Sequence, residues 1–478
     1  MNLPKFMPPM PSMTGNAWSL AIVVCIALLV GTLLPAYVGA MDDNVAKAMA
    51  LPVLLLLILL LLYSRLLLLL LILLVRSSGD IFFESTRFAL GSMQIGVGGL
   101  INAFVILIAL LLVAEKPGLL PKRLTSMWAP FLLVALVGVA IAPVKGDAIR
   151  AYVAQISYLS MFVSAFYLVR SQDDFKRCVR LVLWSSVLPA LYALGGMALH
   201  GGISGPHGNR LQSTFSHPNI FAFYLTLVVS LGFYVLKSAT YSLSYRNKVM
   251  LTGYTFLMLA LLVLTQTRSA WIACLSLFAA YGLMFNRRYL LYLLLAPMLA
   301  LLIPSVRDRL LDLGAGNEVV QYAKLNSFAW RVYIWESGLQ WMRPGNYLLG
   351  YGIDSFQYYS PTFFPLAGKT HFGAHNLYVQ WLFELGALGI GAYLWLFARL
   401  AWWLKALLTI NRLGGVILLT LVLQYMLMSA SDNMASYLVF NWYFWFIVGS
   451  GCAIVAAHSA AQSATGAAIP PIQPGTVQ

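Results

Sequence analysis

The stretch that decides the fold is residues 51–75, which read LPVLLLLILLLLYSRLLLLLLILLV. About 20 apolar residues in a helix cross the roughly 30 Å hydrocarbon core of a bilayer. The rest of the chain has the same character, because 61% of its 478 residues are hydrophobic and 9% are charged, against about 45–50% and about 25% in soluble domains. These values exclude a soluble enzyme and indicate a polytopic membrane protein.

The chain is also strongly basic, with 30 Lys and Arg residues against 15 Asp and Glu residues and a formal net charge of +15. In a soluble protein this excess would suggest nucleic acid as a partner. Here many of the cations lie at the ends of apolar segments, as the positive-inside rule expects for cytoplasmic loops. We therefore predict no nucleic-acid partner and expect membrane lipids to surround the chain.

Apolar segments of spanning length recur along the sequence. They lie near residues 17–39, 47–75, 94–114, 127–143, 150–170, 176–198, 218–237, 248–266, 269–286, 288–304, 376–403, 411–430 and 436–457. This pattern predicts an all-α polytopic membrane protein. The first span is expected to be retained rather than cleaved as a signal peptide. Two readings of the early segments stay open: residues 47–75 are a broken pair around Arg65, or one early segment lies on the membrane surface.

Clusters of basic residues assign the two sides of the membrane. Four groups fall on one side, which the positive-inside rule makes the cytoplasm; they are Arg170, Lys176, Arg177 and Arg180, then Lys237, Arg246 and Lys248, then Arg287 and Arg288, and finally Lys405 and Arg412. This assignment divides the chain into an N-terminal tail (1–16), membrane helices with short loops (17–304), a large periplasmic loop (305–375), C-terminal membrane helices (376–457) and a disordered cytoplasmic tail (458–478). The large loop is expected to contain an amphipathic helix from about residue 329 to 342.

Several basic side chains lie in the outward segments, against the positive-inside bias. They are Arg150, Arg210, His217, Arg268, Arg331, His371 and His375. A single Arg at a helix end commonly extends to lipid head groups, and that reading stays open for each. Clustered guanidinium groups, however, bind phosphate through paired hydrogen bonds, so the set predicts a lipid-linked phosphate or diphosphate as ligand. Arg268 indicates this most clearly, because its charge between two spans is costly unless it is paired or faces water.

His375 is the candidate catalytic residue. It ends the large loop and opens the next span, and its neighbours Gly373, Ala374 and Asn376 are small or polar. A neutral imidazole near pH 7 accepts a proton from a sugar hydroxyl; the alternative is a hydrogen-bonded bystander. Gly386, eleven residues later, is about three helical turns away on the same face, where it would let another helix approach closely.

The outer acidic residues give no sign of a metal site. They contain no DxD motif of the kind that metal-dependent nucleotide-sugar transferases use to hold a divalent ion. Asp308 and Asp312 are four residues apart, but flanking Arg residues favour surface salt bridges there. His371 and His375 have the same spacing without an accompanying Glu or Cys, so zinc is not expected. We predict no metal and no cofactor.

Together these motifs resemble the O-antigen ligase and polymerase superfamily over roughly residues 127–457. The resemblance is carried by Arg210 with Ser213-Thr214-Phe215-Ser216-His217-Pro218-Asn219, the Thr265-Gln266-Thr267-Arg268 turn, Arg331 followed by Trp335, the Pro344 to Gly352 turn and the spacing of His375 and Gly386. It implies a bacterial inner-membrane protein with about twelve spans and cytoplasmic termini. It also implies transfer of a preassembled glycan from undecaprenyl diphosphate to a periplasmic acceptor, which in the ligase branch is the lipid A-core oligosaccharide.

The resemblance also implies roles for individual residues. The family's loop His falls on His375 and its functional Arg residues fall on Arg268 and Arg331, with Arg210 and Arg150 as supporting positions. The resulting hypothesis is a metal-independent inverting glycosyltransferase in which the Arg residues hold the donor diphosphate and His375 deprotonates the acceptor.

Two other functions stay open. An O-antigen polymerase or a protein O-oligosaccharyltransferase would use the same donor, and the single large outer loop favours the ligase. A secondary transporter is the alternative from another class. It is disfavoured because, apart from Arg65, the ionisable residues gather at the outer boundary and no internal repeat is found.

Overall fold

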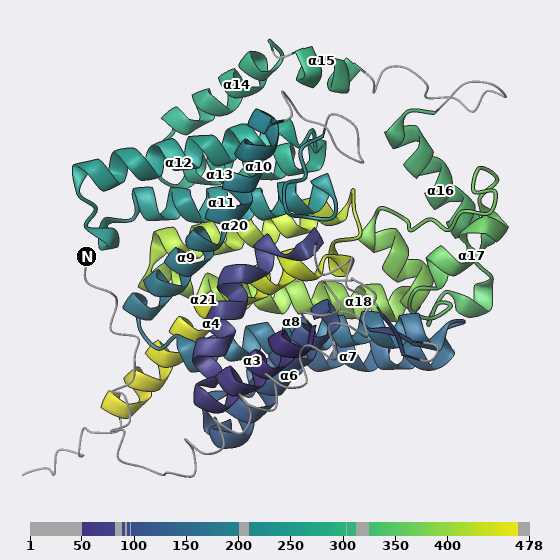
Figure 1. Cartoon of the computed structure of the whole chain (residues 1–478), viewed down its shortest axis with the longest axis horizontal. Coiled ribbons are helices and arrows are strands. Elements are labelled where there is room, and N and C mark those ends of the chain that lie inside the picture. The colour runs from purple at the N-terminus through teal and green to yellow at the C-terminus, as the bar shows by residue number, and fades with distance from the viewer. Residues whose placement is uncertain are drawn as a thin grey trace, which may run out of the picture.

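The computed structural model describes residues 50–81, 88–90, 93–95, 97–199, 210–302, 304–311 and 325–466. The predicted span 17–39, Asp312 and most of the predicted tail 458–478 lie outside these ranges. Within them the structure is helical (Figure 1) apart from one short antiparallel hairpin, in which β1 (Phe88–Leu90) pairs with β2 (Met93–Ile95).

The helices follow the apolar segments of the sequence. In chain order they are α3 (Ala50–Tyr63), α4 (Arg65–Val75), η1 (Arg76–Ser78), α6 (Val97–Glu115), η2 (Pro117–Leu119), α7 (Arg123–Ile141), α8 (Lys145–Leu168), α9 (Gln172–Ser185), α10 (Val187–Leu199), α11 (Pro218–Lys237), η3 (Ala239–Tyr241), α12 (Tyr245–Leu264), α13 (Arg268–Met284), α14 (Arg288–Ala300), α15 (Pro304–Leu311), α16 (Ser327–Trp341), η5 (Pro344–Asn346), α17 (Ser355–Phe363), α18 (Leu377–Lys405), α19 (Leu407–Ile410), α20 (Arg412–Ser429), η6 (Met434–Ser436) and α21 (Leu438–Gly466).

Nine helical segments among the described residues are long and apolar enough to cross a membrane. Two shorter apolar helices, Pro52–Tyr63 and Arg268–Met284, accompany them. The predicted all-α polytopic membrane fold is thus confirmed. The large loop contains short helices as expected. The helix predicted near residues 329–342 is α16, which begins at Ser327 and ends at Trp341, but it has no distinct apolar face.

The aliphatic stretch at residues 47–75 is broken rather than continuous. Ser64 adopts an extended conformation, with φ −161°, between α3 and α4. Its hydroxyl accepts a hydrogen bond from the backbone N–H of Leu67 at 3.3 Å and caps α4, which satisfies one of the amide donors that a helix start leaves open. Arg65 begins α4 and pairs with Glu115 at the end of α6. The broken pair is therefore the reading that the structure supports.

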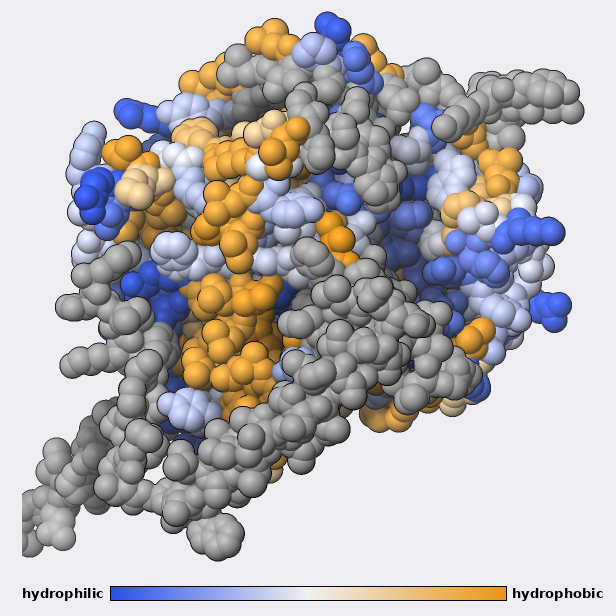
Figure 2. All heavy atoms as spheres, viewed as in Figure 1, coloured by the Kyte–Doolittle hydropathy of each residue, from blue (hydrophilic) through white to orange (hydrophobic). Residues whose placement is uncertain are grey.

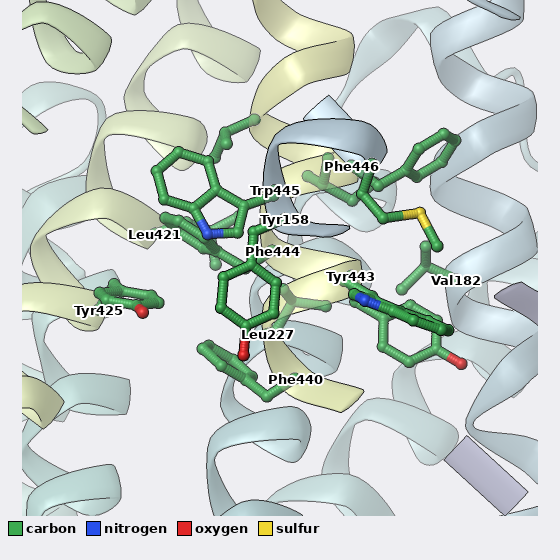
Figure 3. Packing of buried hydrophobic residues seen from close by; sticks show 14 of the residues in the cluster. Tyr158, Val182, Leu227, Leu421, Tyr425, Phe440, Tyr443, Phe444, Trp445 and Phe446 are labelled. Atoms are coloured by element: carbon green, nitrogen blue, oxygen red, sulfur yellow. The ribbon is translucent and has the colours of Figure 1, made fainter. Parts of the chain in front are cut away.

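The core lies around α11 and α21, whose spanning segments are 94% buried inside the chain. A helix that is apolar on all faces is stable only where other helices surround it. Figure 3 shows Trp445 and Phe444 of α21 packed near Tyr158 of α8 and Tyr425 of α20. The outer helices instead expose large apolar side chains such as Leu133 (63%) and Leu294 (63%), and Figure 2 shows apolar surface between more hydrophilic ends. This distribution is that of a protein whose solvent is lipid.

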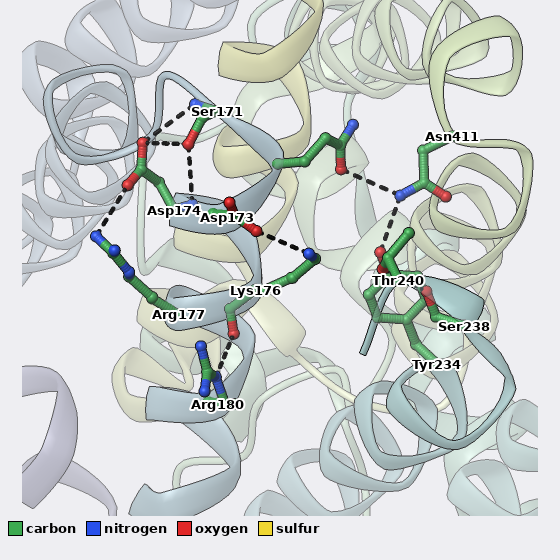
Figure 4. A network of polar contacts seen from close by, with 11 residues as sticks. Ser171, Asp173, Asp174, Lys176, Arg177, Arg180, Tyr234, Ser238, Thr240 and Asn411 are labelled. Carbon is green, nitrogen blue, oxygen red and sulfur yellow. Dashed lines mark hydrogen bonds and ion pairs between the residues drawn. The ribbon is translucent and has the colours of Figure 1, made fainter. Parts of the chain in front are cut away.

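The basic segments meet at one end of the helix bundle. The side-chain amide of Asn411, before α20, donates to Gln172 at the start of α9 (3.2 Å) and to the Tyr234 hydroxyl near the end of α11 (2.9 Å). Arg412 contacts the carbonyl of Met284 at 3.4 Å. Figure 4 shows Asn411 and Tyr234 beside the basic first turns of α9. Helix ends that the sequence assigned to one side of the membrane therefore do lie together.

Candidate functional site

The candidate site lies at the opposite end of the bundle, and Arg210 connects two of its loops. Its Nε donates to the carbonyl of Thr265 (3.0 Å), and its Nη2 lies 2.5 Å from Asn219 Oδ1 and 3.1 Å from Thr267 Oγ1. Asn219 belongs to the first turn of α11, which His217 caps by accepting from the Asn219 N–H at 3.1 Å. The motif around residues 210–219 and the turn before α13 are therefore one structural unit.

Asp432, in the loop between α20 and α21, is the carboxylate at the centre of the site. Its side chain is 1% exposed. It accepts hydrogen bonds from the Asn219 side-chain amide, from the Tyr437 hydroxyl and from the backbone N–H of Asn433 (3.0 Å). Its Oδ1 lies 3.6 Å from Nδ1 of His375. A buried carboxylate is stable only with such compensation.

The electrostatics of Asp432 show which cations surround it. Burial by itself raises the pKa of this carboxyl, but the contact and charge of His375, the Tyr437 hydroxyl and the charge of Arg331 outweigh it and hold the pKa well below its usual range. The charges of Arg331 and Arg210 also oppose the rise in the pKa of Tyr437 that burial and Asp432 cause. His375 and Arg331 therefore act on Asp432, which is ionised at neutral pH, and Arg331 and Arg210 act on its hydrogen-bond partner Tyr437.

His375 occupies a constrained position at the end of the large loop. Its backbone has φ +48°, in the left-handed region that is uncommon for residues other than glycine. Neighbouring contacts hold it there: Trp335 Nε1 donates to the carbonyl of Ala374 (2.5 Å), and the Asn376 N–H donates to Asn433 Oδ1 (3.1 Å). Strained backbone persists only where surrounding contacts determine it, and it is frequent at functional sites.

The imidazole of His375 has one buried and one accessible side. Nδ1 is buried and faces Asp432, whereas the side chain as a whole is 39% exposed, so its accessible surface comes from the other ring atoms. The ring of Trp330 packs against it with a centroid distance of 6.1 Å. A carboxylate beside one nitrogen orients the ring, which leaves the second nitrogen to exchange a proton with a substrate.

Arg268 and Arg331 lie near each other through α16. Arg268 begins α13, and its Nη2 contacts the hydroxyl of Ser327 at 2.7 Å. Ser327 and Arg331 are four residues apart on α16, so they share one face of that helix. Arg331 has no hydrogen-bond or ion-pair partner within the described ranges and is partly buried. The predicted residues Arg210, Arg268, Arg331 and His375 are thus brought to one end of the molecule.

Arg150 has a different environment. It forms an ion pair with Asp147, one turn earlier on α8, at 3.3 Å, and its side chain is 61% exposed. The nearby carboxyl of Asp354 has its pKa raised to about 6 by burial and by the charge of Asp147, with Arg150 opposing that rise. Among the described contacts, none joins Arg150 to Arg331, His375 or Asp432. Its supporting role therefore stays a prediction.

Gly386 is close to a loop rather than to another helix, which corrects the geometry expected from its spacing. It has φ +64° and ψ −165°, so α18 is interrupted there and the same-face argument from His375 does not apply. The turn after α16 fits into this interruption, because the Ala387 N–H donates to the carbonyl of Tyr347 at 2.8 Å. A Cβ on Gly386 would lie 2.4 Å from the carbonyl oxygen of Leu348. Only glycine permits this approach.

Of the residues weighed as metal ligands, Asp312 lies outside the described ranges, and Asp308, His371 and His375 can be located. His371 Nδ1 lies 3.1 Å from the carbonyl oxygen of Gln357, and Asp308 pairs with Arg307 at 3.6 Å. Within the described ranges, no three His, Cys, Asp or Glu side chains converge as metal ligands. The prediction of a reaction without metal or cofactor remains a prediction that activity measurements have to test.

Sequence reasoning did not assign roles to three residues of this site: Asp432, Asn219 and Tyr437. The signal for Asp432 was its position, since it is an acidic residue in a short outer loop between two spans. Its partners come from α11, from the start of α21 and from the end of the large loop, so no sequence spacing reveals them. Asn219 was visible only as part of the motif that begins at Arg210.

Comparison with known proteins covers part of the site. Residues 253–394 match the family model described as O-Antigen ligase, a segment that contains Arg268, Arg331, His375 and Gly386. Arg150, Arg210 and Asp432 lie outside it. No curated protein matches the chain. Residues 253–394 are therefore similar to the O-antigen ligase family, and the predicted resemblance to the O-antigen ligase superfamily is confirmed over this segment.

Proposed function

We propose that this protein transfers O-antigen polysaccharide from undecaprenyl diphosphate to the lipid A-core oligosaccharide, as a metal-independent inverting glycosyltransferase. The match of residues 253–394 to the O-antigen ligase family supports a ligase or polymerase role in lipopolysaccharide-related glycosyl transfer. The observation that carries the finer proposal is the buried Asp432 carboxylate 3.6 Å from His375, with Arg331 acting on this carboxylate and Arg210 connected to it through Asn219.

The donor diphosphate is held by Arg268, Arg331 and Arg210. Guanidinium groups match phosphate oxygens in a bidentate way, and Arg331 keeps its donors free of partners within the described part of the chain. As the glycosidic bond breaks, negative charge grows on the leaving diphosphate. Preorganised cations that stabilise this charge lower the barrier most.

The acceptor hydroxyl is activated by His375. The hydroxyl oxygen attacks the anomeric carbon and forms the new glycosidic bond, while the bond from that carbon to the diphosphate oxygen breaks and undecaprenyl diphosphate leaves with the electron pair. The hydroxyl proton passes to the imidazole, and Asp432 stabilises the resulting imidazolium. A single displacement of this kind inverts the anomeric centre.

The charges at the two ends of the bundle support an orientation in the membrane. The end that gathers Asn411, Arg412 and the basic turns of α9 corresponds to the cytoplasm by the positive-inside rule. The candidate site then faces the periplasm of a bacterial inner membrane. Its donor and its acceptor both carry lipid anchors, so reaction at the membrane surface requires no water-soluble substrate. Apolar outer faces of the helices would contact the polyprenyl tail.

The decisive experiment supplies the purified full chain with undecaprenyl-diphosphate-linked O antigen and one of three acceptors. These are lipid A-core, a second donor molecule and an acceptor peptide. We expect a lipid A-core conjugate, detected by gel shift and mass spectrometry. Polymer growth on the second donor would assign a polymerase, and a glycopeptide would assign a protein O-oligosaccharyltransferase. No product with any acceptor, together with uptake of a labelled solute into vesicles, would assign a transporter instead.

The same assay tests the proposed lack of a metal requirement. Protein treated with EDTA and exchanged into metal-free buffer should retain its rate of transfer, because the Arg side chains stabilise the leaving diphosphate. A loss of activity that Mg²⁺ or Mn²⁺ restores would contradict this part of the proposal.

A further inference from the structure

A charged cavity lies at the basic end of the bundle, away from the candidate site. It encloses about 340 Å³ between the α3–α4 break, the end of α6 and the end of α8. One part of its lining consists of leucines of α3, α4 and α6. The other part is polar and contains Arg65, Glu115, Lys116 and Arg170. The cavity therefore combines apolar and strongly charged walls.

The break at Ser64 helps to form this cavity. A continuous helix through the leucine run would carry α3 past α6 without a gap, whereas the extended Ser64 turns the chain before α4 begins. The first turn of α4 contributes Arg65 and Leu66 to the lining, and the amide groups of a helix start carry partial positive charge. An arginine within an otherwise aliphatic run is costly in a membrane, so its position calls for a polar partner.

The charges in the cavity do not balance. Arg65 is paired with Glu115, but the Lys116 ammonium and the Arg170 guanidinium have no hydrogen-bond or ion-pair partner within the described ranges. Three cations and one carboxylate leave an excess of two positive charges. The neighbouring cations of α9 differ, because Lys176 pairs with Asp173 (Figure 4) and so has its own partner.

We propose that this cavity binds the phosphate head group of an acidic phospholipid from the membrane leaflet at the basic end. Arg65, Lys116 and Arg170 bind the phosphate, and the leucines of the lining contact the first part of an acyl chain. Basic pockets between membrane helices bind acidic head groups in this way. The apolar wall favours a lipid over a soluble phosphate, and exposed Leu62 (78%) and Tyr63 (66%) extend that wall toward the bilayer. The proposal does not depend on the glycosyltransferase activity.

Native mass spectrometry of the full chain in neutral detergent, titrated with phosphatidylglycerol or phosphatidylcholine, tests this site. The test variant is Lys116→Gln/Arg170→Gln. The matched control is Arg246→Gln/Lys248→Gln, which removes two exposed cations from the same end without touching the cavity. Each basic side chain near a membrane surface contributes about 1 kcal/mol, so the test variant should bind phosphatidylglycerol about 30-fold more weakly. The control should change binding less than about twofold.

Three results would overturn the proposal. They are equal binding of the two lipids by the unmodified chain, unchanged phosphatidylglycerol binding in the test variant, and an equal loss in the control variant. Inorganic phosphate and glycerol 3-phosphate serve as competitors, and full displacement of the lipid by either at equal concentration would assign a soluble anion instead. Because Lys116 and Arg170 are exposed, both variants should fold. As a measurement that needs no variant, phosphatidylglycerol binding should weaken as NaCl rises, and salt-independent binding would contradict the proposal.

Discussion

The two ends of the helix bundle use the same residue types in different ways. At the basic end, the ion pairs within α9 are local and open to water: Lys176 contacts Asp173 three residues earlier, and that aspartate side chain is 74% exposed. At the site end, Asp432 is 1% exposed and faces His375 from a distant part of the sequence. Exposed pairs contribute little because water competes for both partners, whereas a buried carboxylate depends on each of its contacts. From this comparison we expect substitutions of the buried pair at the site end to have large effects and substitutions of the exposed pair at the basic end to have small ones.

The largest expected effect is at His375. If its imidazole removes the acceptor proton, His375→Ala should lower the transfer rate about 10²- to 10⁴-fold, with the amount of protein in the membrane unchanged. The matched control is His371→Ala, because His371 lies in the same loop, is exposed and contacts only the Gln357 carbonyl in the described part of the chain. Normal transfer by the His375 variant would show that this residue takes no part in the reaction.

A second large effect is expected at Asp432. Asp432→Asn keeps the shape of the side chain but removes the charge that orients and stabilises His375, so we expect transfer to fall about 10²-fold. The matched substitution at the basic end, Asp173→Asn, should leave transfer unchanged. The pKa of Asp432 is held below its usual range, so its ionised form stabilises the fold above the unfolded pKa and that stabilisation is lost only in strong acid. Transfer by Asp432→Asn at the rate of the unmodified chain would contradict this assignment.

A smaller effect is expected when the shape of a cation changes but its charge does not. Arg268→Lys keeps the positive charge but cannot contact both Ser327 and a phosphate with a planar fork. A hydrogen bond to a charged group contributes about 1.5–3 kcal/mol, which corresponds to a loss in transfer of about 10- to 100-fold. Arg412→Lys, at the basic end, should be neutral. Transfer rates equal to those of the unmodified chain in Arg268→Lys would mean that position 268 needs only a charge.

The smallest effect concerns stability near Arg150. The pKa of Asp354 is raised to about 6 by burial and by the charge of Asp147. A carboxyl whose pKa is raised on folding stabilises the protein while protonated, and that contribution is lost as the pH rises through the folded value. The unfolding temperature should therefore fall as the pH rises from 4 to 6.5. In Asp354→Asn this fall should be smaller, by an amount that corresponds to about 1–2 kcal/mol in the free energy of unfolding after allowing for solvent screening. An unchanged slope would show that Asp354 ionises freely.

Several residues of the candidate site could be singled out from the sequence, each because of its type and its position. Arg268 and Arg331 stood out because a guanidinium on the outer side opposes the topological bias, and the O-antigen ligase match covers both. Arg150 stood out for the same reason, yet the structure pairs it with Asp147 one turn away. Gly386 was expected to let another helix approach closely, but the group that approaches it is the Leu348 backbone, at an interrupted helix. Spacing arguments assume a continuous helix and fail where the helix breaks.

The sequence by itself determined that the chain is a membrane protein, where most of its helices run and which loop is large. These properties follow from hydrophobicity and segment length, which act locally and need no knowledge of partners. Only the tertiary structure decided that His375 meets Asp432, that Arg210 connects the starts of α11 and α13, and that the leucine run breaks to form a charged cavity. Such meetings depend on how helices from distant parts of the chain pack, because side-chain contacts between them are set by burial and shape rather than by any repeat in the sequence.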